Sequence, residues 1–154
     1  MDFITQLPLT KKGHDAIFVV VDKLSKTIKA IPTTTNVTAP EVADLFFHHI
    51  FRHFGLPSII ISDRDSRFTG KFWQTLWAKL GTKLAMSTAF HPQTDSQTKR
   101  ANQVVEQVLR NYTIYEQDNW DELLPFAEFA YNNSVNTSTG FSPFHVLYGQ
   151  EVNT

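Results

Sequence analysis

The order of strand-like and helical patterns predicts an α/β domain, with a five-stranded mixed sheet flanked by helices. Three observations lead to this prediction. Three β-rich segments precede the first helical pattern, which favours an antiparallel meander, and strands then alternate with helices, which favours parallel pairing. The chain has 154 residues, 42% of them hydrophobic and 13 of them Phe, which is enough for one domain with a sizeable core.

The three leading strands are expected at residues 2–7, 16–21 and 27–31. Residues 16–21 form a continuous run of β-branched and aromatic side chains, which is typical of a strand buried on both faces. Pro32 is expected to close the third strand.

A capping box, Thr38 to Glu41, starts the first predicted helix, because the hydroxyl can accept from the N3 amide while the carboxylate reaches back. This helix should end near Phe54, before Gly55. The remaining pattern predicts a strand at 59–61, a helix at 69–80, a strand at 83–86, a polar stretch at 87–96, a long helix from about 97 and a last helix at 120–133.

Composition excludes several protein classes. The chain has no Cys, which excludes a disulfide scaffold, a Cys-containing zinc finger, an iron–sulfur site and cysteine catalysis. Its apolar runs are far shorter than the ~20 residues that cross a bilayer, and no signal peptide or other targeting signal is visible.

The charges are distributed unevenly along the chain. Residues 1–110 hold all 14 Lys and Arg against nine acids, a local net charge of +5, whereas residues 111–154 hold six acids and no Lys or Arg. This polarity suggests one face for an anionic partner and a separate face for something else. A chance distribution over a solvated surface explains it equally well.

Two carboxylates occupy positions suited to a metal site. Asp63 directly follows the apolar strand 59–61, and Asp2 lies in the first strand. Carboxylates that meet at a sheet edge repel one another unless a cation lies between them, and such pairs usually hold Mg²⁺ or Mn²⁺. An Asp after a strand is more often a turn or cap residue, so spacing alone leaves both roles open.

Several motifs in chain order resemble the integrase catalytic core of gypsy-type LTR retrotransposons. They are Asp2-Phe3-Ile4, Val19-Val20-Val21-Asp22-Lys23-Leu24-Ser25-Lys26, Gly55-Leu56-Pro57, Ser62-Asp63-Arg64-Asp65-Ser66-Arg67-Phe68, His91-Pro92-Gln93-Thr94-Asp95, Tyr131-Asn132-Asn133 and Thr139-Gly140-Phe141-Ser142-Pro143-Phe144. The resemblance covers residues 1–154, and it implies a trimmed domain whose first strand is cut at its start. The family's zinc-binding region and C-terminal domain are expected to be absent from it.

The resemblance implies an RNase H-like fold and a metal triad of Asp, Asp and Glu that joins element DNA ends to target DNA with Mg or Mn. Asp2 matches the first carboxylate and Asp63 the second. It also implies a nuclear site of action and a homodimer formed through the helix at 38–54 and the acidic C-terminal helices. The net charge of +5 in residues 1–110 predicts weak, non-specific DNA binding. No membrane or small-molecule partner is expected.

Position 99 departs from the family pattern. Thirty-five residues separate Asp63 from position 99, the spacing at which the family carries its Glu, but this chain has Lys99. An ammonium cannot ligate Mg²⁺, and between two carboxylates it would replace the metal's charge. Asp95 lies one turn before it and Glu106 lies ~10 Å along the helix, so neither is a ready substitute. Ser96, where the family usually has Gly, is a second departure.

Two functions therefore remain open at this point. One is an integrase core for polynucleotidyl transfer that is catalytically impaired by Lys99, with tight metal binding lost. The other is a non-enzymatic DNA- or protein-binding module of the same descent, and a decayed element with no present role fits as well.

The expected DNA contacts are polar and basic side chains around this site. They are Lys71, His91, Gln93, Lys99, Arg100, Gln103 and Arg110. His49 and His53 have the i, i+4 spacing that can bind a transition metal, but without a third ligand a solvated helix face is the simpler interpretation.

Other conspicuous side chains have structural explanations. The acids at 118, 121 and 122 are explained by the dipole of the last helix. Trp73 and Trp77 are expected in the core, whereas Lys71 and Lys79 could face DNA.

Overall fold

The computed structural model describes residues 1–55, 59–62, 67, 70–80, 89–92, 103, 107, 118–137 and 139–149. Its centre is an antiparallel meander of β1 (Asp2–Ile4), β2 (Ala16–Val21) and β3 (Ile28–Thr33). Asp2 lies opposite Val19, and Val19 lies opposite Ala30. The predicted meander is confirmed, and β2 has the predicted bounds.

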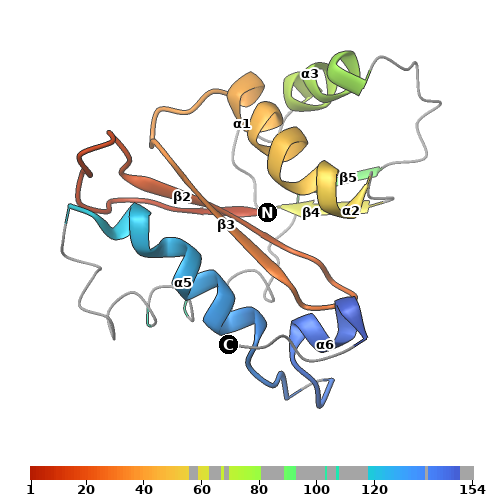
Figure 1. Ribbon diagram of the computed structural model, residues 1–154. Helices are drawn as coiled ribbons and strands as arrows, with labels where there is room; N and C mark the ends of the chain where they lie inside the picture. Colours follow the sequence, from red (N-terminus) through yellow and green to blue (C-terminus); the bar gives the residue numbers. More distant parts are fainter. Residues whose placement is uncertain are drawn as a thin grey trace.

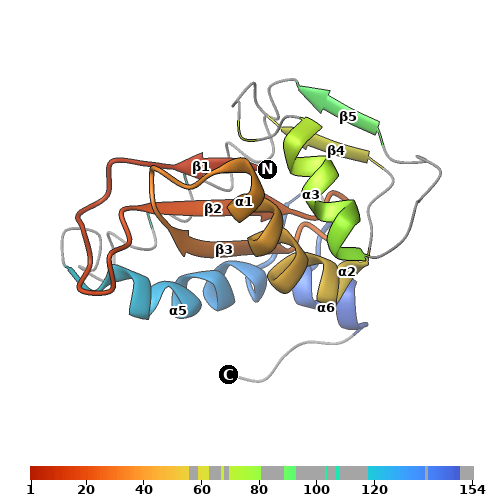
Figure 2. The ribbon, with the colours of Figure 1, turned by 90° about the horizontal axis from the view of Figure 1, so that it is seen from above.

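A second pairing joins β4 (Ile59–Ser62) to β5 (Ala89–Pro92) in parallel. The described strands form a three-stranded antiparallel sheet and a two-stranded parallel sheet, where the sequence predicts a single five-stranded mixed sheet. Figures 1 and 2 place the β4–β5 pair near the N-terminus, on the same side of the molecule as α3.

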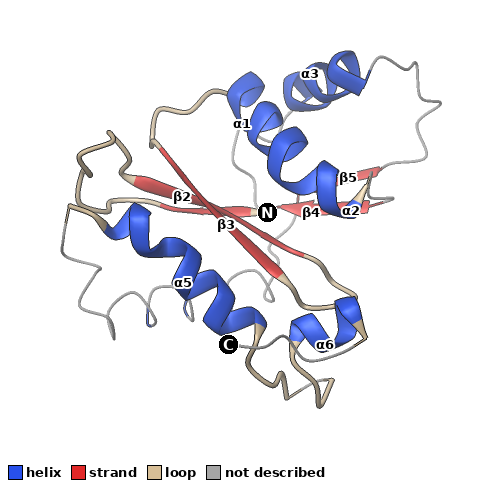
Figure 3. Ribbon diagram, viewed as in Figure 1, coloured by secondary structure: helices blue, strands red, loops and turns tan. Residues whose placement is uncertain are grey.

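Helices cover both faces of the meander (Figure 3). On one face lie α1 (Ala39–Phe46), the π-helix η1 (Phe47–Phe51), α2 (Arg52–Phe54) and α3 (Gly70–Leu80). On the other lies α5 (Trp120–Asn132), followed by α6 (Pro143–Tyr148).

Each face has its own hydrophobic core. The first core packs Phe18 of β2 against Phe46 and Phe72. The second packs Ile17 and Val19 of β2 against Trp120 and Leu124 of α5. Successive residues of a strand face opposite sides, so a strand covered on both faces must be apolar throughout, and residues 16–19 have no exposed surface.

The first helix begins and ends as the sequence predicts. Thr38 Oγ1 accepts from the amide of Glu41, and the Glu41 carboxylate accepts from the amide of Thr38. The helical path ends at Gly55, whose φ of 72° is in the left-handed region that a Cβ disfavours. The π-helical turn at η1 was not predicted, because apolar periodicity does not separate a π-turn from an α-turn over five residues.

Three strand predictions need correction. The first strand ends at Ile4, because Gln6 takes a positive φ and turns the chain. The third strand continues through Pro32 to Thr33, because β3 is an edge strand and proline's missing N–H costs nothing on its outer side. The predicted strand at 83–86 lies outside the described residues, and a strand instead occupies 89–92, within the stretch predicted to be polar loop.

That last error has a physical reason. The run Ala89–Pro92 ends in His-Pro, which locally reads as a loop, but its parallel pairing with β4 supplies the hydrogen bonds that a lone polar segment lacks. Helix α6 was also missed, although Ser142 caps it by accepting from the amide of His145 and Pro143 occupies its first turn.

Helix α5 satisfies the outer edge of β3 with two side chains. Asn132 accepts from the amide of Ile28 at 2.8 Å and donates to the carbonyl of the same residue at 3.0 Å. Glu128 accepts from the amide of Ala30 at 2.7 Å, and burial raises the pKa of this carboxyl. The helix thus closes an edge that would otherwise be open to pairing with another strand.

Replacing Asn132 should destabilise the domain strongly. Asn132→Ala leaves the N–H and C=O of Ile28 buried without partners, and we expect the free energy of unfolding to fall by about 2–4 kcal/mol. Asn133→Ala is the matched control, because its Oδ1 has no hydrogen-bond partner among the described residues. Urea denaturation of both variants tests this, and equal losses would contradict the assigned role of Asn132.

Candidate functional site

The first candidate carboxylate lies at the start of β1, the first strand of the meander. Asp2 is half-buried, and its Oδ1 accepts from the amide of Phe3 at 2.7 Å. The Phe3 ring packs against Phe18 with centroids 5.2 Å apart, which anchors this part of β1 on the first core. Asp2 is thus held on a strand that is anchored to the core.

Arg67 brings the segment after β4 to this strand. Its guanidinium carbon lies 3.9 Å from the centroid of the Phe3 ring, a cation–π contact, and its Nη1 donates to the carbonyl of Thr35 at 3.0 Å. β4 ends at Ser62, so Arg67 lies five residues beyond the strand end. Arg67 is therefore tied to Phe3, the neighbour of Asp2 in β1.

The described residues test only part of the predicted site. Five of the predicted residues lie outside them: Asp63, Gln93, Lys99, Arg100 and Arg110. His91 is in β5, in register with Ile61, and Gln103 is an exposed helical residue. Lys71 is exposed on α3, whereas Lys79 forms an ion pair with Asp44 of α1 instead of a free basic surface.

No group of three or more His, Cys, Asp or Glu side chains with the geometry to hold a metal ion is present among the residues that the structure describes. His49 and His53 are both exposed, as predicted for a solvated helix face. Burial lowers the pKa of His49, and the neighbouring cations His48, Lys29, Arg52 and His53 lower it further. Trp73 is buried, as predicted, and the Trp77 side chain lies outside the described part of the chain.

Comparison with known proteins identifies the family. Residues 1–92 match the family described as integrase core domain. The Tf2-3 transposon polyprotein of Schizosaccharomyces pombe is 36% identical over 148 residues, which are 96% of this chain and 11% of the polyprotein. The Tf2-4 polyprotein of the same yeast matches equally well.

The chain belongs to the integrase core domain family.

Solved structures of low sequence identity share the fold of this integrase core. A chain of the simian T-cell lymphotropic virus intasome, solved in complex with the PP2A regulatory subunit B56γ, has a TM-score of 0.71 at 17% identity, covering 99% of this chain and 55% of that one. The HTLV-2 integrase catalytic core with magnesium, in a trimeric form, has a TM-score of 0.68 at 17% identity, covering 95% and 93% of the two chains.

The catalytic core of BIV integrase has a TM-score of 0.65 at 20% identity, covering 96% and 93%. These likenesses confirm the RNase H-like fold. No helix in the described ranges is long and apolar enough to cross a membrane. The integrase core spans 11% of the length of the Tf2 polyproteins.

A second polar cluster lies at the other end of the meander and was not anticipated. Asp121, 7% exposed, accepts from the hydroxyl of Thr10 at 2.8 Å, and its Oδ2 lies 2.6 Å from Nδ1 of His14. The indole of Trp120 donates to the carbonyl of Pro8 at 2.7 Å. These contacts hold the β1–β2 connection against the start of α5.

The acids at the start of α5 are therefore not explained by the helix dipole alone. Lys11 lies 4.0 Å from Asp118 and Lys12 lies 3.8 Å from Glu122, so cations of the N-terminal segment pair with acids of the C-terminal one. At this place, lysines and acids from opposite ends of the sequence lie side by side in the fold. A His four residues after a Thr carried no sequence signal, because the partner is more than a hundred residues away.

Low pH should weaken the contacts between the β1–β2 connection and the start of α5, because Asp121 becomes protonated. Burial raises its pKa, but the hydrogen bonds from His14 and Thr10 outweigh burial, and the pKa lies below its ordinary value of 3.8. A carboxyl with a lowered pKa in the folded state stabilises the fold above its unfolded pKa and loses that contribution as the pH falls through the folded one. We expect Asp121→Asn to be less stable than the wild type at pH 7, and the difference to shrink below about pH 4.

The free energy of unfolding, measured by urea denaturation from neutral to acid pH, checks this expectation. Asp118→Asn is the control, because its side chain is 56% exposed and pairs only loosely with Lys11. A stability difference between wild type and Asp121→Asn that is constant across the acid range would rule out the carboxylate as its cause.

Proposed function

We propose that this integrase core engages DNA at the edge marked by Asp2 and Asp63, as a polynucleotidyl transferase by descent that is catalytically impaired by Lys99. The contact of Arg67 with Phe3 carries this proposal. Asp63 lies four residues before Arg67, and four residues span at most about 14 Å. Together with the position of Asp63 directly after β4, this supports a pair of carboxylates at one sheet edge.

The donor set does not suit a three-carboxylate metal site. The sequence supplies Asp2, Asp63 and Lys99, and an ammonium has no lone pair for a metal ion and repels it. The HTLV-2 core of the same fold is described in complex with magnesium. In this chain we propose that the Lys99 ammonium relieves the repulsion between the two carboxylates, which leaves only a weakened site for Mg or Mn.

In the proposed function, residues of this chain bind the DNA and orient it. The rigid part is β1, which fixes Asp2 against the core through Phe3 and Phe18. The basic and polar side chains proposed to lie along DNA phosphates are Lys71, His91, Gln93, Lys99, Arg100, Gln103 and Arg110. Among the described ones, Lys71 and Gln103 are exposed, as such contacts require.

The second candidate function is a DNA- or protein-binding module without catalysis. The observation that favours it is Lys99 itself, because a reversal of charge is more drastic than loss of one ligand. A nuclear location is part of the proposal by family resemblance, and the dimeric and trimeric forms of the HTLV-2 core make a homodimer part of it as well.

Changing Lys99 tests the impaired site. We expect Mn²⁺ to leave the melting temperature of the wild type unchanged. Lys99→Glu gives three converging acids, so it should be less stable in EDTA and regain stability with metal, by ~2.7 kcal/mol at a hundredfold excess over Kd. Lys99→Ala is the control, because it loses the cation without gaining a ligand and should be destabilised but insensitive to metal.

Thermal denaturation of the three proteins with and without Mn²⁺ gives the answer. A saturable shift of the wild type as large as that of Lys99→Glu would mean that another group supplies the third ligand, and the proposed impairment would be wrong. Strand-transfer or nicking assays of the wild type in Mn²⁺ then separate the two candidate functions.

DNA binding should be weak, independent of sequence and strongly dependent on salt. Binding of Lys and Arg to phosphates releases counterions, so the logarithm of the affinity falls by about one slope unit for each phosphate contacted. We expect Arg100→Gln with Arg110→Gln to lower this slope by about two. Fluorescence anisotropy with two unrelated duplexes measures it, and absence of binding at low salt would refute the proposal.

A further inference from the structure

The turn at residues 22–27, between β2 and β3, presents an apolar side chain between two cations. Leu24 is 82% exposed, the largest exposed fraction among the big hydrophobic side chains of the described residues. Lys23 precedes it and is exposed, and Lys26 follows two residues later and is half-buried. A single exposed leucine is common at protein surfaces, so what distinguishes Leu24 is its position between two lysines.

The exposure of Leu24 is imposed by hydrogen bonds inside the turn. Asp22 Oδ2 accepts from the hydroxyl of Ser25 at 2.6 Å, and the carbonyl of Asp22 accepts from the amide of Lys26 at 2.8 Å. Ser25 and Thr27 are 3% and 2% exposed, and their hydroxyls lie 2.8 Å apart. Polar groups thus fill the inside of the turn, and Leu24 is held outward on a fixed frame.

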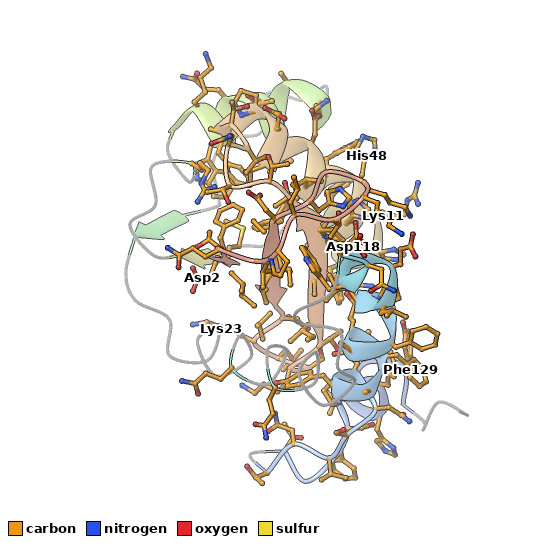
Figure 4. All side chains as sticks on the ribbon, turned by 90° about the vertical axis from the view of Figure 1, so that its left-hand side faces the viewer. Asp2, Lys11, Lys23, His48, Asp118 and Phe129 are labelled. Atoms are coloured by element: carbon orange, nitrogen blue, oxygen red, sulfur yellow. The ribbon has the colours of Figure 1, made fainter. Side chains whose placement is uncertain are left out.

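The turn lies at the same end of the meander as Asp2. Because β1 and β2 are antiparallel with Asp2 opposite Val19, the start of the turn at Asp22 is three residues further along β2, about 10 Å from that register. Figure 4 views the meander roughly along its strands, and across the sheet Asp2 and Lys23 lie on the left, toward β5, while Lys11 and Asp118 lie on the right, beside α5. The turn therefore borders the sheet edge to which DNA binding is assigned.

The opposite end of the meander has similar residues in a different setting. The β1–β2 connection also carries an exposed leucine, Leu9 at 66%, close to Lys11 and Lys12. There Lys11 lies 4.0 Å from Asp118, just before α5, and Lys12 lies 3.8 Å from Glu122 of α5. In the turn at 22–27 the carboxylate of the neighbouring acid, Asp22, accepts from the hydroxyl and the amide of Ser25.

We propose that the turn at residues 22–27 is a contact for duplex DNA, with Lys23 and Lys26 against phosphates and Leu24 against the apolar sugar or base edges between them. This inference rests on the proposed function and adds a contact outside the residues named there. Phosphates position a protein on the duplex, and an apolar side chain in a groove adds contact area that a flat anionic surface cannot offer. A rigid frame limits the entropy lost on binding.

The test compares the two ends of the meander by fluorescence anisotropy with a short duplex over a range of salt concentrations. Lys23→Gln with Lys26→Gln should weaken binding and lower the salt slope by about two. Lys11→Gln with Lys12→Gln, which removes the same charge at the other end, should leave both unchanged. Thermal denaturation of each variant verifies that it is folded.

The leucines separate apolar contact from charge. Leu24→Ser should weaken binding roughly threefold to tenfold without changing the salt slope, because it removes apolar contact but no cation. Leu9→Ser is the matched control and should bind as the wild type does.

Each failure has a distinct meaning. If the wild type binds DNA, and Arg100→Gln with Arg110→Gln weakens that binding while the variants at 23, 24 and 26 do not, the turn is not a DNA contact and the proposed function stands. If the wild type does not bind DNA at low salt, the proposed function itself fails. If Leu24→Ser changes the sedimentation of the protein but not its DNA affinity, the turn is a protein contact and the inference is overturned.

Discussion

The burial of β2 on both faces is the constraint on which the rest of the domain depends. Residues 16–19 have no exposed surface, because α1 and α3 cover one side of the strand and α5 covers the other. A strand buried in this way cannot slip by one residue without moving its neighbours to the wrong core, so its register is fixed. That register places Asp2 opposite Val19 and sends the turn at 22–27 to the same end of the sheet.

The two ends of this sheet differ in chemistry. At one end, Asp121 of α5 binds the side chains of Thr10 and His14. Two surface ion pairs lie beside it, between Lys11 and Asp118 and between Lys12 and Glu122. At the other end, Arg67 stacks on Phe3 beside Asp2, and the turn at 22–27 carries Lys23 and an exposed Leu24. In the proposed function, DNA binds at this second end, where Lys23 is exposed.

Membership of the family does not depend on the residue at position 99. The core, the meander and the anchoring of Asp2 are those of an integrase core domain, and none of them depends on the third acidic residue. Packing and catalysis are held by different side chains, so the fold does not depend on which residue stands at position 99. For this reason membership of the family and catalytic competence are separate questions here.

The sequence by itself determined the elements whose causes are local. Apolar continuity predicted β2, the Thr38–Glu41 box and Gly55 predicted both ends of the first helical segment, and the motifs predicted the family. Only the tertiary structure decided what depends on distant partners. The strand Ala89–Pro92 exists through pairing with β4, β3 extends through Pro32 because its outer edge faces α5, and Asp121 is buried against His14 and not solvated. The physical reason is the same in each case: a polar group can be buried only where a hydrogen-bond partner meets it, and such partners are brought together by the fold and not by proximity in the chain.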